Sequence, residues 1–447
     1  MNIRQPFLFL HPEKLKNEFL MTNISEYYNI IQNLLESACK YDICMTLVSN
    51  SDINNTGFSD YEVICAAGAE SELPFNNSSD YFNDLKKYLD STKDFVFGHF
   101  GYDLKNQIED LVSVHNDNIG FPDAYFFVPS NIITYSNKKL HVVKKDKFFD
   151  LSSDSISRVK NIINNKTAII NKRITSDVYI NTINEIKKQI QRGNIFEMNF
   201  CYEYYIDNYT INPVDVFMEI NEISPMPFAG LYKYYDKYLL CFSPERFIKK
   251  TGNKILSQPI KGTIKRSSNI SDDAALKSQL KNSLKERTEN IMITDLVRND
   301  LSKSAKQGTV KVDELCKVYP FKQVYQMIST ISAIVADNIH PADIIKNAFP
   351  MGSMTGAPKV KAMQIAERYE KTKRGLYSGS IGYFTPENDF DFNVVIRSIC
   401  YNETGKYLNF MVGSAITSQC KAEDELEECE LKAGAFFHWI RNSIYAE

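Results

Sequence analysis

The sequence predicts an α+β protein in which helices flank a large antiparallel sheet. Three runs near the carboxyl end have the β-branched and aromatic composition of strands, namely residues 376–384, 391–401 and 407–417. Two segments, 272–307 and 424–441, have the residue pattern of helices. The chain has 447 residues, of which 43% are hydrophobic and 24% charged, so a folded soluble protein is expected.

The first part of the chain also mixes the two kinds of element. We expect a helix over 24–40 and another over 103–111, and we expect strands over 41–50, 95–102, 124–135 and 140–143, the last two as a pair. A loop is expected at 50–60. Residues 150–178 are rich in Ser, Asn and Lys. We interpret them as the connection between an N-terminal portion, residues 1–150, and a catalytic portion, residues 175–447. The N-terminal portion is expected to pack into the same fold.

The catalytic portion starts with a predicted helix over 179–191, and Gly193 follows it as a C′ glycine would. Strands are expected over 196–205 and 237–242. A further helix is predicted over 358–370, with Pro358 in its first turn.

Composition excludes several classes of function. The net charge of −3 does not favour nucleic acid, which needs a basic face. None of the nine cysteines forms a C-x-x-C pair, which fits free thiols in a reducing cytosol, and the six histidines form no zinc motif. No apolar run of about 18 residues predicts a membrane span. The start has no signal-peptide pattern, so a cytoplasmic location is expected.

Lys261 is the most informative candidate for chemistry. It lies in a Pro-Ile-Lys-Gly-Thr segment, between Glu245 in Ser-Pro-Glu-Arg-Phe and Glu289 in a predicted helix. A lysine held near carboxylates that can bind a cation is typical of a site in which the lysine amine acts as a nucleophile. The alternative is a surface lysine beside a turn.

Two acidic helices suggest a metal site. Glu425, Glu428 and Lys432 share one helical face, and Glu289 lies beside the apolar residues of another helix. Carboxylates from two helices that meet in a cleft would form an oxygen site for Mg²⁺. Taken alone, a solvated face with ion pairs explains the first helix equally well.

Three segments are candidates for anion binding. The Gly352–Lys359 run, which includes Thr355, places glycines and a hydroxyl before a helix N-terminus. Arg397 ends an apolar strand and needs a carboxylate partner or a ligand, while Tyr377 lies in a Gly-rich turn. Gly413, Ser414 and Ala415 close another strand and would expose backbone N–H groups. An N-capped loop and an internal salt bridge are the corresponding alternatives.

Together, in this order, the segments resemble the family that contains anthranilate synthase component I and aminodeoxychorismate synthase component I. The matching stretch begins near residue 95 and reaches the carboxyl end. Its strongest segments are Ser243–Phe247, Pro259–Thr263, Glu289–Asp300, Gly352–Lys359, Tyr377–Tyr383 and Glu425–Lys432.

The resemblance implies a fold of stacked antiparallel sheets flanked by helices, chorismate as substrate and Mg²⁺ as cofactor. It implies that Glu289 and Glu428 bind the metal, with Glu425 close by, and that Glu245 is the acid and base at the C4 hydroxyl. Tyr377 and Arg397 would hold the enolpyruvyl carboxylate. The backbone of Gly413, Ser414 and Ala415, with Thr355 and Lys432, would hold the ring carboxylate.

Lys261 separates branches of this family. Anthranilate, isochorismate and salicylate synthases generally have Ala there, and the aminodeoxychorismate branch has Lys, which attacks ring C2 before ammonia attacks C4. For this attack the lysine must be neutral, and we expect burial beside a metal cation to lower its pKa. Glu197 stands where isochorismate-forming relatives have a water-activating lysine. Gln326 replaces a histidine linked to pyruvate elimination, which disfavours aromatisation.

The resemblance therefore implies amination of chorismate to 4-amino-4-deoxychorismate, in p-aminobenzoate and folate biosynthesis. The chain lacks the Gly-x-Cys-x-Gly segment of a glutaminase, so ammonia is expected from a separate glutamine amidotransferase subunit or from free ammonium. Two alternatives remain: anthranilate synthase component I, and a non-catalytic chorismate-binding regulatory subunit.

Overall fold

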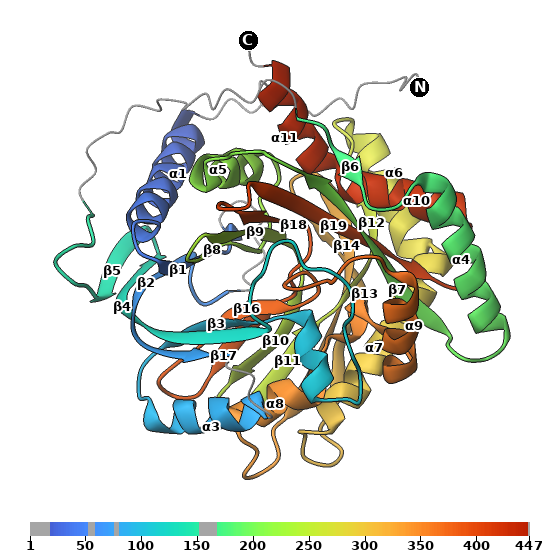
Figure 1. Cartoon of the computed structure of the whole chain (residues 1–447), viewed down its shortest axis with the longest axis horizontal. Helices are drawn as coiled ribbons and strands as arrows, with labels where there is room; N and C mark the ends of the chain where they lie inside the picture. The colour runs from blue at the N-terminus through green and yellow to red at the C-terminus, as the bar shows by residue number, and fades with distance from the viewer. Residues whose placement is uncertain (1–17, 52–58, 76–79, 152–167, 446–447) are drawn as a thin grey trace.

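Helices and strands both occur throughout the described chain (Figure 1). The structure is a computed structural model, and it describes residues 18–51, 59–75, 80–151 and 168–445. The helices are α1 (Glu18–Ala38), α3 (Tyr81–Ser91), η1 (Tyr102–Gln107), α4 (Ser176–Gln191), α5 (Pro213–Ile223), α6 (Ile270–Asn282), α7 (Leu284–Ser302), α8 (Pro341–Ala348), η2 (Gly352–Met354), α9 (Lys359–Tyr369), α10 (Ala422–Lys432) and α11 (Gly434–Tyr445). The strands are β1 (Ile43–Val48), β2 (Val63–Pro74), β3 (Val96–Phe100), β4 (Ala124–Ser136), β5 (Lys139–Lys144), β6 (Asn171–Lys172), β7 (Glu197–Ile206), β8 (Phe228–Tyr234), β9 (Lys237–Ser243), β10 (Arg246–Thr251), β11 (Lys254–Gln258), β12 (Ile260–Lys265), β13 (Lys311–Pro320), β14 (Val324–Ile334), β15 (Gly356–Ala357), β16 (Ser380–Phe384), β17 (Phe390–Asn393), β18 (Ser398–Asn402) and β19 (Tyr407–Ile416).

These strands form one hydrogen-bonded network, and each of their pairings is antiparallel. Neighbour by neighbour, the network runs β7, β19, β18, β9, β8, β1, β2, β4, β3, β16, β17, β10, β11 and β14, and β14 also pairs with β12 and β13. β7 and β12 therefore lie near opposite ends of the network.

The network folds over on itself into two stacked layers. One apolar cluster contains inward residues of both halves, for example Met45 and Leu239 with Phe97 and Ile381. A second cluster joins the outer face of the first half to α1, α4, α5 and α11, and a third joins the outer face of the second half to α3, α7 and α8. In Figure 1, α1 and α5 accordingly lie above the strands and α3 and α8 below them. The expected fold of stacked antiparallel sheets flanked by helices is confirmed.

Most of the expected elements are present, and several bounds are wrong. The single helix expected over 272–307 is two helices, because Ser283 adopts an extended conformation and caps α7 by accepting a hydrogen bond from the Glu286 N–H. The helix expected over 424–441 is also divided, at Ala433. The strand expected over 391–401 is interrupted between Asn393 and Ser398.

Smaller differences occur at other ends. The helix expected over 103–111 is a short 3₁₀ turn that ends at Gln107, and the strand expected from residue 376 begins at Ser380. Pro358 caps α9 instead of lying in its first turn. Gly193 has a φ of 75°, as a C′ glycine does, and β4 pairs with β5 as expected. Much of the predicted loop 50–60 and connection 150–178 lies outside the described residues.

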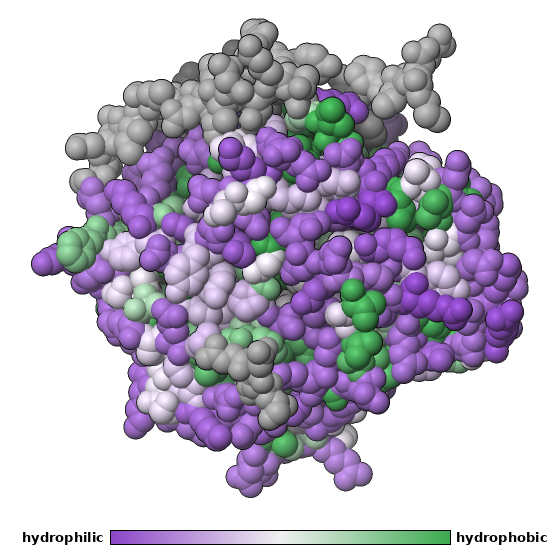
Figure 2. Space-filling model, in the orientation of Figure 1, coloured by the Kyte–Doolittle hydropathy of each residue, from purple (hydrophilic) through white to green (hydrophobic). Residues whose placement is uncertain are grey.

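The face of the molecule in view is largely hydrophilic, and apolar residues form only small patches on it (Figure 2). All nine cysteines are free, and eight of them are buried, which agrees with their interpretation as small core residues. In the part of the chain that the structure describes, no helix combines the length and the apolar character that a membrane crossing needs.

Candidate active site

The side chain of Lys261 joins the two ends of the strand network. Its Nζ lies 3.2 Å from Oε1 of Glu197, which is the first residue of β7. The Lys261 side chain is 12% exposed and that of Glu197 is 1% exposed. The alternative of a surface lysine is therefore wrong. This buried ion pair holds the amine inside the protein, between β12 and β7.

The local backbone explains how Lys261 reaches this position. The register of β12 against β14 shifts between Ile260 and Thr263, and such an irregularity re-aims the side chains within it. Gly262 has a φ of 92°, and a Cβ there would lie 3.0 Å from a carboxylate oxygen of Glu286. A side chain at this position would both strain the backbone and press on α7.

α7 and α10 carry four carboxylates in this region, and three of them, Glu286, Glu289 and Glu428, interact electrostatically with Lys261. Glu289 is buried and its Oε1 has no hydrogen-bond partner. Burial, with the negative charge of Glu286 in support, raises the pKa of Glu289 to about 7 against the pull of Lys261. Glu425 pairs with Lys285 at 3.0 Å. Burial and the charge of Glu428 raise the pKa of Glu425 as well.

Glu428 differs from its neighbours because it has a strong partner. The Lys432 ammonium lies 2.7 Å from its carboxylate and holds the pKa of Glu428 below its usual value. Among the described residues, no three carboxylate, histidine or cysteine side chains converge closely enough to form a complete metal site. The orphaned oxygen of Glu289 and the mutual repulsion of these carboxylates nevertheless fit a divalent cation, which favours oxygen ligands and retains waters.

Glu245 approaches Lys261 from the start of β10. Its side chain is buried, and burial raises the pKa of its carboxyl to about 7, although the positive charges of Lys261 and Arg397 oppose the rise. A carboxyl with such a pKa holds a proton for part of the time at neutral pH, so Glu245 can donate one.

Backbone hydrogen bonds join the segments that contain Tyr377 and Arg397. Ser378, next to Tyr377, donates its N–H to the carbonyl of Val395, and Arg397 has a φ of 51°. Burial lowers the pKa of Arg397 to about 10, against the opposing charge of Glu245. The Arg397 guanidinium forms no ion pair with any residue that the structure describes, so the alternative of an internal salt bridge is not seen there. A half-buried cation without a partner suits an anionic ligand.

The proposed cradle segments lie against β7. Gly413 and Ala415 pair with Cys201 and Asn199, and the Lys432 ammonium donates to the Gly413 carbonyl at 2.8 Å. The Thr355 carbonyl accepts from the Asn199 N–H at 2.8 Å.

The two hydroxyls of this region are already bonded to the protein. The Thr355 hydroxyl donates to carbonyls of the preceding turn, at Met351 and Gly352. The Ser414 hydroxyl shares a hydrogen bond with the phenol of Tyr179 at 2.8 Å. Any contact of Thr355 or Ser414 with a ligand through its hydroxyl would need a change of partner. Lys359 in the same run forms an ion pair with Asp300 at 2.6 Å, so its positive charge is already balanced within the protein.

Two residues have surroundings that the sequence does not predict. The sequence indicates Glu197 only as a replacement for a lysine, and the structure makes it the partner of Lys261. Gln326 is fully buried beside Thr263 in the β12–β14 pairing, and neither atom of its side-chain amide has a hydrogen-bond partner. An acidic residue in the apolar run Phe-Glu-Met-Asn-Phe was the available signal for the first.

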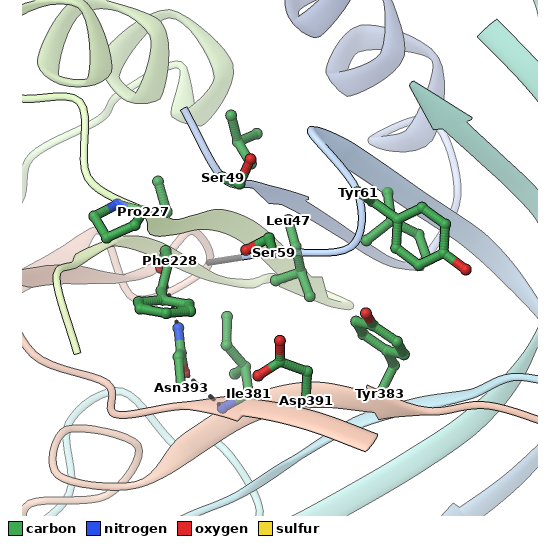
Figure 3. A pocket seen from close by; sticks show the side chains of 13 residues that line it. Leu47, Ser49, Ser59, Tyr61, Pro227, Phe228, Ile381, Tyr383, Asp391 and Asn393 are labelled. Carbon is green, nitrogen blue, oxygen red and sulfur yellow. Dashed lines mark hydrogen bonds between the residues drawn. The ribbon is translucent and has the colours of Figure 1, made fainter. Parts of the chain in front are cut away.

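A separate cavity of about 40 Å³ lies between the two layers, where β1 and β8 face β16 and β17 (Figure 3). Tyr61, Phe228 and Tyr383 line it, together with Asp391. The carboxylate of Asp391 binds the guanidinium of Arg246 through two contacts of 2.9 Å. None of the site residues described above lines this cavity.

A buried amine among carboxylates and an unpaired guanidinium, which both interact with Glu245, define an enzyme site for an anionic substrate. Comparisons with known proteins identify the family. The sequence profile of the chorismate binding enzymes matches residues 47–438, and the chain therefore belongs to the chorismate binding enzyme family.

Named relatives agree with this assignment. The chain is 33% identical over 382 residues to the chloroplastic aminodeoxychorismate synthase of Arabidopsis thaliana, a match that covers 79% of this chain and 41% of that protein. It is 30% identical over 356 residues to aminodeoxychorismate synthase component 1 of Salmonella typhimurium, covering 78% and 77% of the two chains. The crystal structure of anthranilate synthase component I from Streptococcus pneumoniae has a TM-score of 0.72 at 22% identity, over 83% of this chain and 90% of that one.

Proposed function

We propose that this enzyme aminates chorismate at ring carbon C4 to give 4-amino-4-deoxychorismate. The observation that carries the proposal is the burial of Lys261 within the acidic cluster. The proposed reaction needs an amine nucleophile there, whereas the resemblance implies that the other branches generally have alanine at this position. The names of the Arabidopsis and Salmonella relatives support the same choice.

In this proposal Lys261 forms the first new bond. Its neutral amine attacks C2 of the ring, both ring double bonds shift by one position, and the bond from C4 to its hydroxyl oxygen breaks. Glu245 donates a proton so that water leaves instead of hydroxide. Ammonia then attacks C4, both double bonds shift back, and the amine of Lys261 leaves C2.

The remaining charged side chains bind the substrate. Arg397, with Tyr377 beside it, would receive the enolpyruvyl carboxylate, and the segment Gly413–Ala415, with Lys432 and Thr355, would receive the ring carboxylate. Glu289, Glu425 and Glu428 would hold Mg²⁺, which when bound supplies positive charge against the ring carboxylate.

The ammonia source in this proposal is a separate glutamine amidotransferase, with free ammonium as a substitute in the test tube. The Salmonella relative is itself named as one component of its synthase. The pathway that this product would enter is p-aminobenzoate and folate biosynthesis.

Product analysis tests the proposal directly. The purified chain is incubated with chorismate, Mg²⁺ and ammonium, and the products are separated and weighed by mass spectrometry. We expect 4-amino-4-deoxychorismate, which a downstream lyase converts to p-aminobenzoate. Fluorescent anthranilate formed without added lyase would instead identify an anthranilate synthase, and tight binding of chorismate without turnover would identify a regulatory subunit.

A further inference from the structure

The surroundings of Lys261 in the ligand-free protein favour its ammonium form. Burial alone would lower the pKa of its ammonium, but the negative charges of Glu197 and Glu289, with that of Glu428, outweigh burial and raise it. The expected lowering of this pKa depends on a bound metal cation and stays a prediction. An ammonium has no lone pair with which to attack carbon, so a nearby group must first accept a proton.

Glu197 is placed to accept this proton. Its Oε1 lies 3.2 Å from Nζ of Lys261, while its Oε2 is buried without a hydrogen-bond partner. Its backbone is fixed, because it pairs with Ala357 of β15 and the next residue pairs with Ile416 of β19. A carboxylate that served only as a structural ion-pair partner at this depth would be expected to have both oxygens satisfied.

The other charged groups near Lys261 have different positions and partners. Those that interact with it electrostatically come from α7, from α10 and from the start of β10, and they are Glu286, Glu289, Glu428, Lys432 and Glu245. Glu428 is neutralised by Lys432. Glu289 belongs to the acidic cluster that fits a cation, and Glu245 must give a proton to the leaving hydroxyl. Among the described residues, Glu197 is the carboxylate that forms an ion pair with Lys261.

We propose that Glu197 is the proton acceptor that converts the Lys261 ammonium into the amine nucleophile, an inference that rests on the proposed amination. One proton moves from Nζ to Oε1, so an ammonium and a carboxylate become an amine and a carboxylic acid. The amine then attacks C2. When ammonia displaces Lys261 in the second half of the reaction, the lysine leaves as an amine and regains its proton from Glu197.

The dry surroundings favour such an exchange. Two opposite charges in a low-dielectric site lose most of their solvation, and transfer of the proton leaves two neutral groups for which this loss is small. Substrate that covers the remaining exposed part of Lys261 would exclude water further and bring the neutral pair closer in free energy to the ionic pair.

The substitution Glu197→Gln tests the inference, because glutamine keeps the shape and an accepting oxygen but cannot take the proton. We expect kcat for amination to fall by about 100-fold or more, the range of a lost general base. We also expect the ratio of wild-type to variant rate to shrink as pH rises from 6 to 9, because solvent increasingly removes the proton. Glu197→Asp, which keeps the base at a longer distance, should retain more activity and the wild-type pH profile, and it serves as the test if the glutamine variant does not fold.

Glu203→Gln is the matched control. Glu203 lies on the same face of β7, about 20 Å along the strand by the usual rise per residue. It is equally buried, and it pairs with Arg173 at 2.8 Å. Its loss should alter stability without altering the shape of the pH profile.

A second measurement is independent of chorismate. Acetylation of Lys261 by acetic anhydride at pH 8, followed by peptide mass mapping, reports how much free amine is present. Because Glu197→Gln removes a negative charge, it should speed acetylation of Lys261 while it slows amination. If amination in Glu197→Gln stays within about twofold of wild type, or if acetylation and amination both slow, the inference is overturned, since Glu197 then only positions the lysine. A wild-type protein that aminates nothing would overturn the proposed function itself, and the inference with it.

Discussion

The pH dependence of amination should report the proton on Glu245. Burial sets the pKa of this carboxyl at about 7. With that value the protonated fraction is about 0.9 at pH 6 and about 0.1 at pH 8, so the rate should fall about tenfold over this interval. The fall goes toward high pH because Glu245 acts as an acid, and the deprotonated form cannot donate.

Glu289 should add to the pH profile a limb in which the rate rises with pH. Its carboxyl also has a pKa of about 7, and it must lose its proton before it can bind a cation. At low Mg²⁺ the profile of kcat/KM should therefore be a narrow bell. Raising Mg²⁺ should move the acid limb to lower pH, because the cation competes with the proton, and should leave the basic limb in place.

The assay is the initial rate of 4-amino-4-deoxychorismate formation between pH 5.5 and 9, at limiting chorismate. Free ammonia is held constant by adjusting total ammonium at each pH, so that the nucleophile supply does not distort the profile. Glu245→Gln provides the control, because its residual rate should lack the basic limb. A wild-type kcat/KM that stays level from pH 6 to 8.5, or rises, contradicts the role of Glu245 as acid.

Three further predictions follow from the same structure. Lys261→Ala should abolish amination at C4 and permit at most addition of ammonia at C2, as product analysis would show; unchanged C4 amination would refute the covalent route. Glu289→Gln should stabilise the metal-free protein at pH 8 by up to about 3 kcal/mol and hardly at pH 4, since a carboxyl whose pKa is raised on folding contributes stability that is lost as pH rises toward 7. Thermal melts at both pH values, with and without Mg²⁺, would measure this change in stability. Equal shifts of the melting temperature at the two pH values would contradict the prediction. Asp391→Ala should destabilise the folded protein by about 3–5 kcal/mol because it removes the carboxylate that pairs with the buried Arg246 cation. Asp295→Ala, which breaks an exposed ion pair, should change stability by less than about 1 kcal/mol in denaturant titrations. Similar effects of the two substitutions would show that burial does not decide the outcome.

The element types were predictable from the sequence, and the boundaries were less so. Apolar spacing identified α4 and the β4–β5 pair because both depend on local periodicity. The break between α6 and α7 depends on one hydroxyl, since Ser283 has the extended conformation of an N-cap and its side chain accepts from the Glu286 N–H. Serine also occurs inside helices, so the residue type alone does not reveal such a break.

The candidate site was harder to predict because its central contact joins residues far apart in the chain. Family motifs pointed to Lys261, Glu245 and Glu289, and each of these lies buried in the structure or nearly so. No periodicity or motif relates Glu197 to Lys261. Their pairing follows from the order of strands between them, which only the folded network determines.

This dependence on strand order also explains why the site needs the N-terminal strands. β1, β2, β3 and β4 lie in the middle of the network that connects the β7 end to the β12 end. The Lys261–Glu197 contact closes that network across its two layers, so its geometry depends on each pairing in between. A substitution that loosens the N-terminal strands should consequently weaken the ion pair without touching either residue. The Lys261 amine is thus positioned by the whole sheet as well as by its immediate neighbours.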